Sequence, residues 1–173
     1  MKTVRIGGVP EHFNYAWYIG FKSNAFKAQG IDLRWVNCPG GTGQMNEALK
    51  QNSIDMAVVL TDGIVKAISD GISSKIVQTF VKSPLIWGIH VATKSYYTKV
   101  SELKNTQAAI SRMGSGSHLM AYLQAQKLGW NTTNELHFKI IKNLEGGVKA
   151  LGEREADYFL WEKYTTKPFV DSG

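Results

Sequence analysis

The chain has 173 residues, of which 43% are apolar and 20% charged, a balance typical of globular proteins. The length allows one domain or two small lobes, and no stretch reaches the roughly 18–20 consecutive apolar residues of a membrane span. The net charge of +6 is shared, with nine basic and six acidic residues in 1–90 and eleven and eight in 91–173. No basic run is long enough for the concentrated patch that nucleic-acid binding needs. We therefore expect no nucleic-acid partner, and the charge favours an anionic small ligand.

Cys38 is the only cysteine, so no disulfide can form within the chain. The four histidines, His12, His90, His118 and His137, lack the spacing of a zinc site. We expect neither a metal nor a cofactor.

The N-terminus runs from Met1 directly into a strand-like segment, without the apolar stretch of a signal peptide. Two locations fit this start. The protein is periplasmic or otherwise in the cell envelope if a signal peptide was removed, and cytoplasmic if none was present.

Short apolar strands and helical patterns alternate along the first half. Apolar residues alternate from Val4 to Gly8, then recur at helical spacing from Tyr18 to Ala28, where Gly30 can end the helix. Residues 54–60 form a continuous apolar run, as in a strand buried on both faces. The expected elements are strands over 4–8, 31–35, 54–60, 75–80 and 85–91, helices over 18–28 and 45–49, and a glycine-rich loop at 39–43.

The second half repeats this scheme. Its expected elements are strands over 108–111, 137–141 and 157–161, a Gly/Ser loop at 114–117, a helix from Leu119 that Gly129 closes, and a helix over 145–154. Strands that alternate with helices predict α/β layers around a largely parallel sheet.

An internal echo indicates two related lobes. The motif Ala-Leu-x5-Asp occurs at Ala48–Asp55 and again at Ala150–Asp157, each time between a Gly-Gly turn and an apolar strand. We assign residues 1–88 to the first part of lobe 1, and residues 89–173 to lobe 2 and the start of a return hinge. The crossing between lobes is expected near residues 82–98.

The order of these motifs resembles a known family. Gly40-Gly41-Thr42-Gly43, then Ile54-Asp55, then Thr61-Asp62-Gly63, and Arg112–Ser117 opening the second lobe, are similar to type II periplasmic solute-binding proteins for nitrate, sulfonates, taurine and thiamine-pyrimidine precursors (the NMT1/THI5-like group). The resemblance covers essentially the whole chain and implies a two-lobed fold with mixed, largely parallel sheets. It also implies a monomer that holds a small molecule between its lobes and delivers it to an ABC-type permease.

One feature departs from that family. Its chains cross to the second lobe and then return to complete the first, whereas this chain stops at Thr165–Gly173, about where the return would begin. The resemblance therefore implies that the return is missing and that the chain is a fragment of a longer protein.

Two loops are the leading candidates for ligand binding. In two-lobed α/β proteins the ligand meets loops at the carboxyl ends of strands. Loops that open a helix can hold an anion on free N–H groups, and an arginine nearby can pair with it. Capping turns have the same composition, so a purely structural role stays open. The candidates are Gly41, Thr42 and Gly43 in the first lobe and Arg112, Gly114, Ser115, Gly116 and Ser117 in the second.

Further candidates lie at other strand and helix ends. Asp62, after Thr61, can cap a helix or meet a ligand amine, and Asn14 opens the first helix. The aromatic residues can stack on a flat, heteroaromatic ligand or belong to the core. Glu162, beside Trp161, is a weaker candidate of the same sort as Asn14, a polar side chain that could face the ligand. The remaining candidates are Thr61, Trp17, Trp87 and Trp161.

No enzyme motif is present. The sequence lacks a Walker A loop, a G-x-G-x-x-G loop and a G-x-S-x-G elbow, and we expect a binding protein with no catalytic residues. The alternative is a cytoplasmic enzyme on the same fold that makes menaquinone or thiamine-pyrimidine precursors. A third class, the effector-binding half of a transcription regulator, lacks its DNA-binding segment here.

Overall fold

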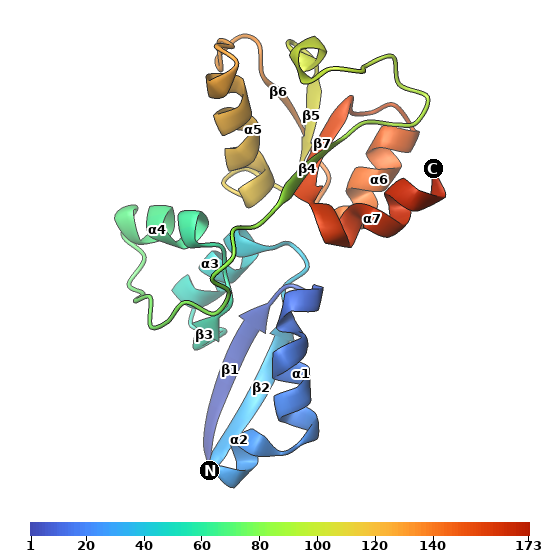
Figure 1. Cartoon of the computed structure of the whole chain (residues 1–173). Coiled ribbons are helices and arrows are strands. Elements are labelled where there is room, and N and C mark those ends of the chain that lie inside the picture. Colours follow the sequence, from blue (N-terminus) through green and yellow to red (C-terminus); the bar gives the residue numbers. More distant parts are fainter. The chain divides into compact units, whose positions relative to one another are not determined.

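The computed structural model describes all residues from 1 to 173. The chain divides into two units, Met1–Pro84 (unit 1) and Leu85–Gly173 (unit 2), each with its own sheet and helices (Figure 1). Every strand pair but one is parallel. The predicted fold class, α/β with largely parallel sheets flanked by helices, is confirmed.

Unit 1 is built on a three-stranded parallel sheet in the order β2-β1-β3. Its central strand pairs along its whole length with β2, from Lys2↔Ile31 to Gly8↔Asn37, but with β3 at two positions only. The long strand expected over 54–60 is therefore short. The elements are β1 (Lys2–Gly8), β2 (Ile31–Asn37), β3 (Met56–Ala57), a 3-10 turn η1 (His12–Asn14), and the helices α1 (Tyr15–Lys22), α2 (Ala25–Ala28), α3 (Thr42–Lys50) and α4 (Thr61–Ser69).

The single helix predicted over 18–28 is wrong: the structure has α1 and α2. Asn24, which separates them, has a φ of 55° and lies in the left-handed region, where an L-residue cannot continue a right-handed helix. The apolar spacing persists across the break because both short helices keep an apolar side toward their neighbours: Trp17 and Phe21 each have ring contacts with Phe26.

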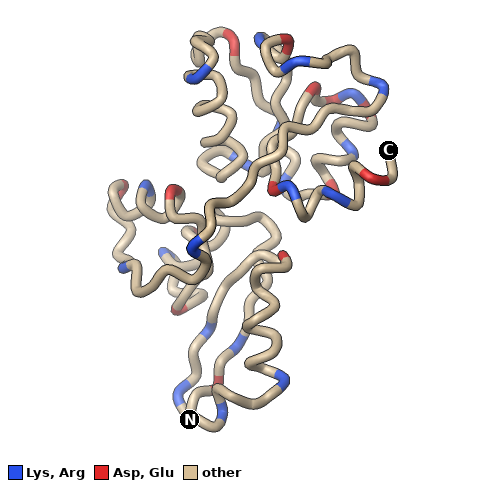
Figure 2. The backbone as a smooth tube through the Cα atoms, viewed as in Figure 1, with Lys and Arg blue, Asp and Glu red and all other residues tan.

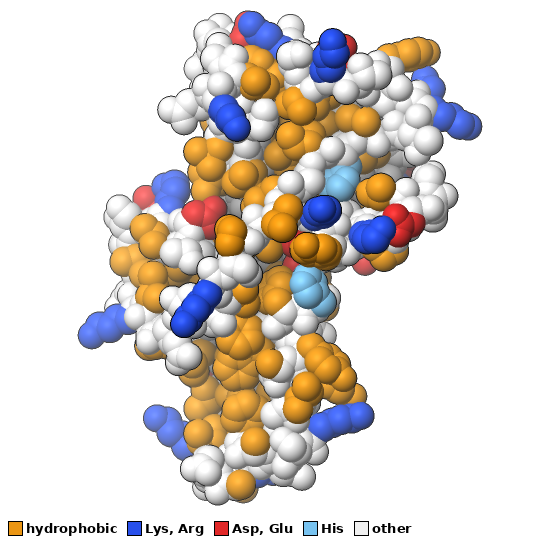
Figure 3. Space-filling model, viewed as in Figure 1, with side chains coloured by type: hydrophobic (Ala, Val, Ile, Leu, Met, Phe, Trp, Pro, Cys, Tyr) orange, Lys and Arg blue, Asp and Glu red, His pale blue; other side chains and the backbone are white.

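The strand predicted over 75–80 is also absent, since these residues pair with no other strand. β-branched residues favour an extended chain, but a strand also needs a neighbour that supplies N–H and C=O groups. Ile76 and Val77 are 55% and 81% exposed. Figure 3 shows apolar side chains gathered on the visible face of unit 1.

Unit 2 has a four-stranded sheet in the order β4-β7-β5-β6, in which only β4 is antiparallel, to β7. The structure confirms strands near three predicted positions, 108–111, 137–141 and 157–161. The elements are β4 (Trp87–His90), β5 (Gln107–Ile110), β6 (His137–Ile140), β7 (Tyr158–Glu162), a 3-10 turn η2 (Val100–Leu103), and the helices α5 (Gly116–Lys127), α6 (Leu144–Gly152) and α7 (Lys163–Ser172).

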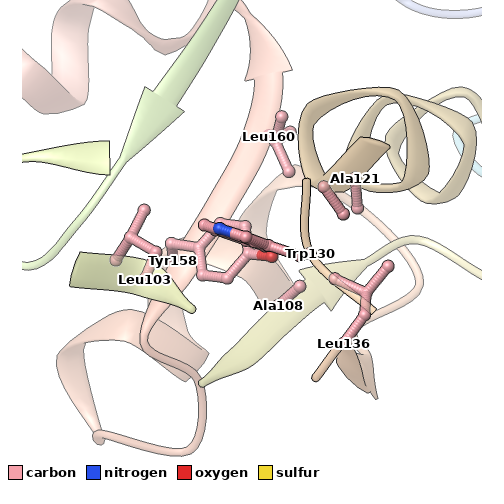
Figure 4. Packing of buried hydrophobic residues seen from close by; sticks show 8 residues of the cluster. Leu103, Ala108, Ala121, Trp130, Leu136, Tyr158 and Leu160 are labelled. Atoms are coloured by element: carbon pink, nitrogen blue, oxygen red, sulfur yellow. The ribbon is translucent and has the colours of Figure 1, made fainter. Parts of the chain in front are cut away.

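The two faces of this sheet form two separate apolar clusters, because successive strand residues point to opposite faces. On the face covered by α5, Tyr158 and Leu160 pack with Ala108, Ala121 and Trp130 (Figure 4). On the face covered by α6, Phe159 packs with residues that include Ala109 and Ala150. Strand β7 is thus buried on both sides and forms the centre of unit 2.

The repeated Ala-Leu-x5-Asp motif has the same structure in both units. Asp55 accepts a bond from the Arg5 N–H through its carboxylate and donates its own N–H to the Arg5 carbonyl, both at 2.8 Å. Asp157 makes the same two bonds to Gln107, again at 2.8 Å. The Arg5 guanidinium adds two bonds to Asp55, and these bonds with that from the Arg5 N–H lower the pKa of Asp55 to about 2. Asp55 therefore fixes the start of β3 to β1, and Asp157 fixes the start of β7 to β5.

Charged residues are spread along the backbone of both units, with no long run of Lys and Arg (Figure 2). Exposed ion pairs tie many of them together, among them Lys66–Asp70 and Lys139–Glu155. None of the helices has the length and apolar character to cross a membrane.

The buried hydroxyl of Tyr158 generates a prediction. The side chain is 1% exposed and its hydroxyl has no hydrogen-bond partner. Burial, with the charge of Asp157, raises the pKa of Tyr158 to about 12. Because an unpaired buried hydroxyl costs about 1–3 kcal/mol, Tyr158→Phe should raise the free energy of unfolding by about 1 kcal/mol at neutral pH. Urea unfolding followed by circular dichroism measures it.

The same variant should also change how the free energy of unfolding falls at alkaline pH. The stability that the neutral phenol contributes is complete below pH about 10, where the unfolded tyrosine titrates, and is lost as pH rises toward the folded pKa of about 12. Tyr158→Phe should lose less stability above pH about 10 than the parent does. Tyr96→Phe, at a side chain 89% exposed, is the control. It should change neither the free energy of unfolding at neutral pH nor its decrease at alkaline pH.

Candidate functional site

Unit 1 gathers three of the predicted segments at one edge of its sheet. The parallel strands β1, β2 and β3 all end there, so the segments that follow them, 9–14, 38–42 and 58–62, emerge side by side. Each of these segments leads into a helix, α1, α3 and α4 respectively (Figure 1). This is the edge at which ligands bind in open α/β sheets.

The first turns of α3 and α4 are fastened to each other. The Thr42 hydroxyl accepts a bond from the Leu60 N–H at 3.3 Å, and the Asn46 amide donates to the Gly63 carbonyl at 3.2 Å. A methyl group at Gly63 would come within 2.5 Å of Thr42 Cγ2, so only glycine allows this approach. The Thr42 side chain is 5% exposed. Thr42 was predicted as a ligand-binding residue, and the structure gives its side chain a structural role, which is to join the two helices.

Neither of these two helices has a side-chain cap. Gly41 stands at the N-cap of α3 and Leu60 at that of α4, and neither supplies a side-chain acceptor. The first N–H groups of a helix have no partner within it, and the aligned peptide dipoles add positive potential at that end. Two adjacent helix ends, from Thr42–Gly43 and from Thr61, therefore offer donors to an anion. Asp62, also in this turn, is exposed.

Asn14 contributes an acceptor at the same edge. Its side chain is 6% exposed, and its Nδ2 donates to the Val9 carbonyl at 2.8 Å. That bond fixes the orientation of the amide, because a flipped amide would place two oxygens together. The Asn14 Oδ1 is buried without a hydrogen-bond partner. A buried orphan acceptor favours a ligand that brings an N–H or O–H group.

Trp17 lies among aromatic rings of unit 1. Its ring is 5.5 Å from Phe80, 6.0 Å from Phe26 and 6.4 Å from Trp35 between centroids. These contacts give it a core role in the aromatic layer over β2. Its indole N–H is buried without a partner, so a second role as a donor remains a prediction.

Unit 2 places its predicted residues at the matching edge of its own sheet. Segments 111–116 and 141–143 follow the parallel strands β5 and β6, and β7 ends at Glu162, directly before α7. The antiparallel strand β4 begins at this edge, where Trp87 pairs with Glu162 and Gly88 with Trp161. Trp87, Trp161 and the 111–117 loop thus share one edge. The Trp161 N–H is buried without a partner.

The two predicted serines of this loop face inward. Ser115 and Ser117 are 3% and 2% exposed, and their hydroxyl oxygens are 3.0 Å apart. Ser117 Oγ accepts from the Ser111 N–H at 3.0 Å, and Ser115 Oγ caps α5 by accepting from the His118 N–H at 3.3 Å. These hydroxyls shape the loop. Gly116 opens the helix directly after the cap, and the half-buried Arg112 lies in the same loop.

Glu162 is a helix cap. Its two carboxylate oxygens accept from the N–H groups of Tyr164 and Thr165 at the start of α7. Asn143 caps α6 in the same way, through the Gly146 N–H. In contrast with α3 and α4, these two helix starts already hold an acceptor, which makes them weaker anion sites.

Sequence reasoning missed Gln44 and His118, which organise the two glycine-rich loops. Gln44 Oε1 accepts from the Gly40 N–H at 2.8 Å, and His118 Nδ1 accepts from the Gly114 N–H at 2.9 Å. Each acceptor lies four residues after its glycine, on the first turn of the helix that the loop opens. The sequence signal that could have identified these two residues is a glycine followed, four residues later, by a side chain that can accept a hydrogen bond.

Comparison with known proteins agrees with this architecture. A family model described as Ca3427-like PBP, a group of periplasmic binding proteins, matches residues 86–173. The chain belongs to this family. No curated protein matches the chain, and the finer grouping with NMT1/THI5-like proteins stays a prediction.

Several solved structures have a fold similar to that of the Ca3427-like chain. The Candida albicans CA3427 gene product, described as having the generic periplasmic binding protein fold, is 27% identical with a TM-score of 0.90, over 99% of this chain and 57% of its own. The alkanesulfonate-binding protein SsuA from Xanthomonas axonopodis pv. citri, bound to MOPS, is 18% identical with a TM-score of 0.76, over 99% and 58%.

A third relative of the fold is PhnD1 from Prochlorococcus marinus in complex with methylphosphonate, 10% identical with a TM-score of 0.63, over 98% of this chain and 66% of its own. The periplasmic-binding-protein fold predicted from the sequence is thereby confirmed. The chain spans 57% of the length of the Candida albicans relative.

The inward-facing serines of the Ca3427-like chain generate a prediction. Ser117→Ala removes the acceptor of the buried Ser111 N–H, and an unsatisfied buried donor costs about 1–3 kcal/mol. The variant should therefore lower the free energy of unfolding by about that amount, measured by urea unfolding. Ser101→Ala, at an exposed position of unit 2, is the matched control. A Ser117→Ala variant as stable as the control would show that Ser117 does not hold the loop.

Proposed function

We propose that the chain is the ligand-binding part of a solute receptor that takes up a small organic anion and delivers it to an ABC-type permease. The observation that carries the proposal is the pair of uncapped helix starts, α3 and α4, fastened together at the carboxyl edge of the unit 1 sheet. Such helix ends are suited to oxyanions such as sulfonates, carboxylates and phosphates.

The orphan acceptor of Asn14 refines the expected ligand. Its buried Oδ1 needs a hydrogen-bond donor, which a bare oxyanion does not carry. We propose a ligand that combines an anionic group with an amine, amide or ring N–H. A heteroaromatic acid fits as well as an aminosulfonate, and the partly buried Trp87 and Trp161 offer stacking surfaces in unit 2.

Two relatives of the fold support an anionic ligand, since one is bound to MOPS, a sulfonate, and the other to methylphosphonate. Unit 2 offers a second set of candidate ligand-binding groups, at the loop edge of its own sheet. Arg112 lies there, and the first N–H groups of α5 at Gly116 and Ser117 precede the first bond within the helix. We propose that each of the two edges is an anion-binding edge of its own unit, and that ligand binding there is the signal read by the permease.

A thermal-shift screen tests the proposal. Sulfonates with and without an amine, nitrate, pyrimidines, riboflavin and aromatic carboxylates are added in rising concentration. Binding to the folded state alone raises the melting temperature with a saturable dependence on concentration. We expect the largest shift from an anion that also carries an N–H group. If no compound shifts the transition, the receptor proposal fails and the enzyme alternative is tested by turnover of vitamin-pathway intermediates.

A variant locates the site. Gly63→Ala places a methyl group 2.5 Å from Thr42 Cγ2 and must separate the starts of α3 and α4. Loss of one bond to a charged ligand corresponds to about tenfold or more in affinity, so calorimetry with the best compound of the screen should show at least that weakening.

The control for this variant is Gly152→Ala, at a helical glycine with open space around it, and it should bind as the parent does. Unchanged affinity in Gly63→Ala would remove the α3/α4 edge from the site.

A further inference from the structure

The two glycine-rich loops are held by the same bond, made by different side chains. In unit 1 the Gly40 N–H donates to the Gln44 amide oxygen, and in unit 2 the Gly114 N–H donates to His118 Nδ1. In each case the acceptor stands at the third helical position and reaches back to the residue before the N-cap. The arrangement is a variant of the capping box, in which a side chain at this position reaches back to the N-cap N–H.

The two acceptors differ in one chemical property. The amide oxygen of Gln44 is an acceptor at every pH, whereas an imidazole nitrogen accepts only while it carries no proton. Because a main-chain N–H can only donate, the bond from Gly114 requires Nδ1 of His118 to be unprotonated, and the ring proton of the neutral form is on Nε2. The hold on the unit 2 loop therefore depends on the charge of one ring.

The surroundings of His118 favour the neutral ring. Its Nε2 is buried without a hydrogen-bond partner, and its ring packs edge-on against Tyr122 and Phe138, 4.9 and 4.7 Å away between centroids. Burial lowers the pKa of His118 below its ordinary value, and no charged group adds to the shift.

The groups packed around the ring explain this absence. On its own helix α5 the facing titratable group is Tyr122, and the residue that β6 packs against the ring is Phe138, which does not titrate. The neighbouring β6 residues are engaged elsewhere, since Lys139 pairs with Glu155 and His137 bonds to Asn105. The charged residue of the loop itself is Arg112, and burial remains the only cause of the lowered pKa of His118.

We propose that His118 is a positioning residue for the Gly114–Ser117 loop and releases the loop when it is protonated, so that the candidate ligand-binding loop of unit 2 is assembled only while the ring is neutral. Protonation converts Nδ1 from an acceptor into a donor facing the Gly114 N–H, and the two N–H groups repel. Gly114, with a φ of +77°, then keeps only the turn bond from the Ser115 N–H to the Arg112 carbonyl, 3.2 Å long, to hold its left-handed conformation. The ligand role of this loop rests on the proposed function; its release does not.

The chain supplies its own control variants. His118→Gln gives unit 2 the acceptor that unit 1 already uses at the same helical position, and it cannot titrate. Gln44→His makes the reciprocal change in unit 1 at an exposed side chain. The pair separates the chemistry of the acceptor from the identity of the loop.

The experiment measures amide hydrogen exchange at Gly114 and Gly40 by NMR between pH 7.5 and 5, corrected for the intrinsic pH dependence of exchange. The ring nitrogens of His118 are followed in the same samples. In the parent, protection at Gly114 should fall by about tenfold or more with the midpoint of the His118 titration, while Gly40 stays constant. His118→Gln should abolish the fall, and Gln44→His should transfer it to Gly40. Constant protection at Gly114 through the His118 titration, or an unchanged fall in His118→Gln, overturns the proposal.

A binding arm distinguishes this inference from the proposed function. The probe is 1-butanesulfonate, whose charge is constant over this range. Its dissociation constant should rise by about fivefold or more from pH 7.5 to 5 in the parent, and this ratio should approach one in His118→Gln. If 1-butanesulfonate binds at no pH while Gly114 exchange follows His118, the sulfonate form of the proposed function fails and the positioning role stands. If it binds and its affinity follows pH equally in both proteins, the positioning role fails.

Discussion

The structure of each unit depends on an aspartate that lies just before a strand and joins it to the neighbouring parallel strand. Asp55 and Asp157 each use the carboxylate and the main-chain N–H to grip a single residue of the adjacent strand. Parallel pairing has no hairpin to set its register, so these two-point contacts fix the register of β3 on β1 and of β7 on β5. The register in turn sets which loops lie beside one another at the opposite edge, where the candidate residues lie.

At that edge, most of the polar side chains serve the loops themselves. Ser115, Ser117 and Glu162 are occupied by main-chain N–H groups of their own segments, and Thr42 by that of Leu60. In unit 1, what remains for a ligand comes mainly from the main chain and from Asn14. Such a site is set by the positions of helices, so that its affinity responds to helix packing at Gly63 as much as to any side chain that touches the ligand.

Composition and periodicity were sufficient for the α/β class and for much of the strand and helix order, because burial of a strand on one face gives apolar alternation and burial on both faces gives a continuous apolar run. They failed where a tertiary condition decides. Residues 75–80 have the pattern of a strand but lack a partner, and Asn24 interrupts a helix that apolar spacing alone would continue. The loops at 39–43 and 114–117 were found from glycine and serine content. The roles of Gln44 and His118 were not, because a side chain reaching back to a glycine N–H leaves no trace in hydrophobic pattern.

The register of β4 against β7 also has a practical consequence. It brings Trp87 and Trp161 to one end of the unit 2 sheet, half-buried, with the Trp161 N–H out of contact with water. Indole emission shifts in wavelength and intensity with the polarity around the ring and with quenching groups that approach it. The molecule therefore carries an intrinsic optical reporter at the sheet edge, and events there are open to stopped-flow observation without any attached dye.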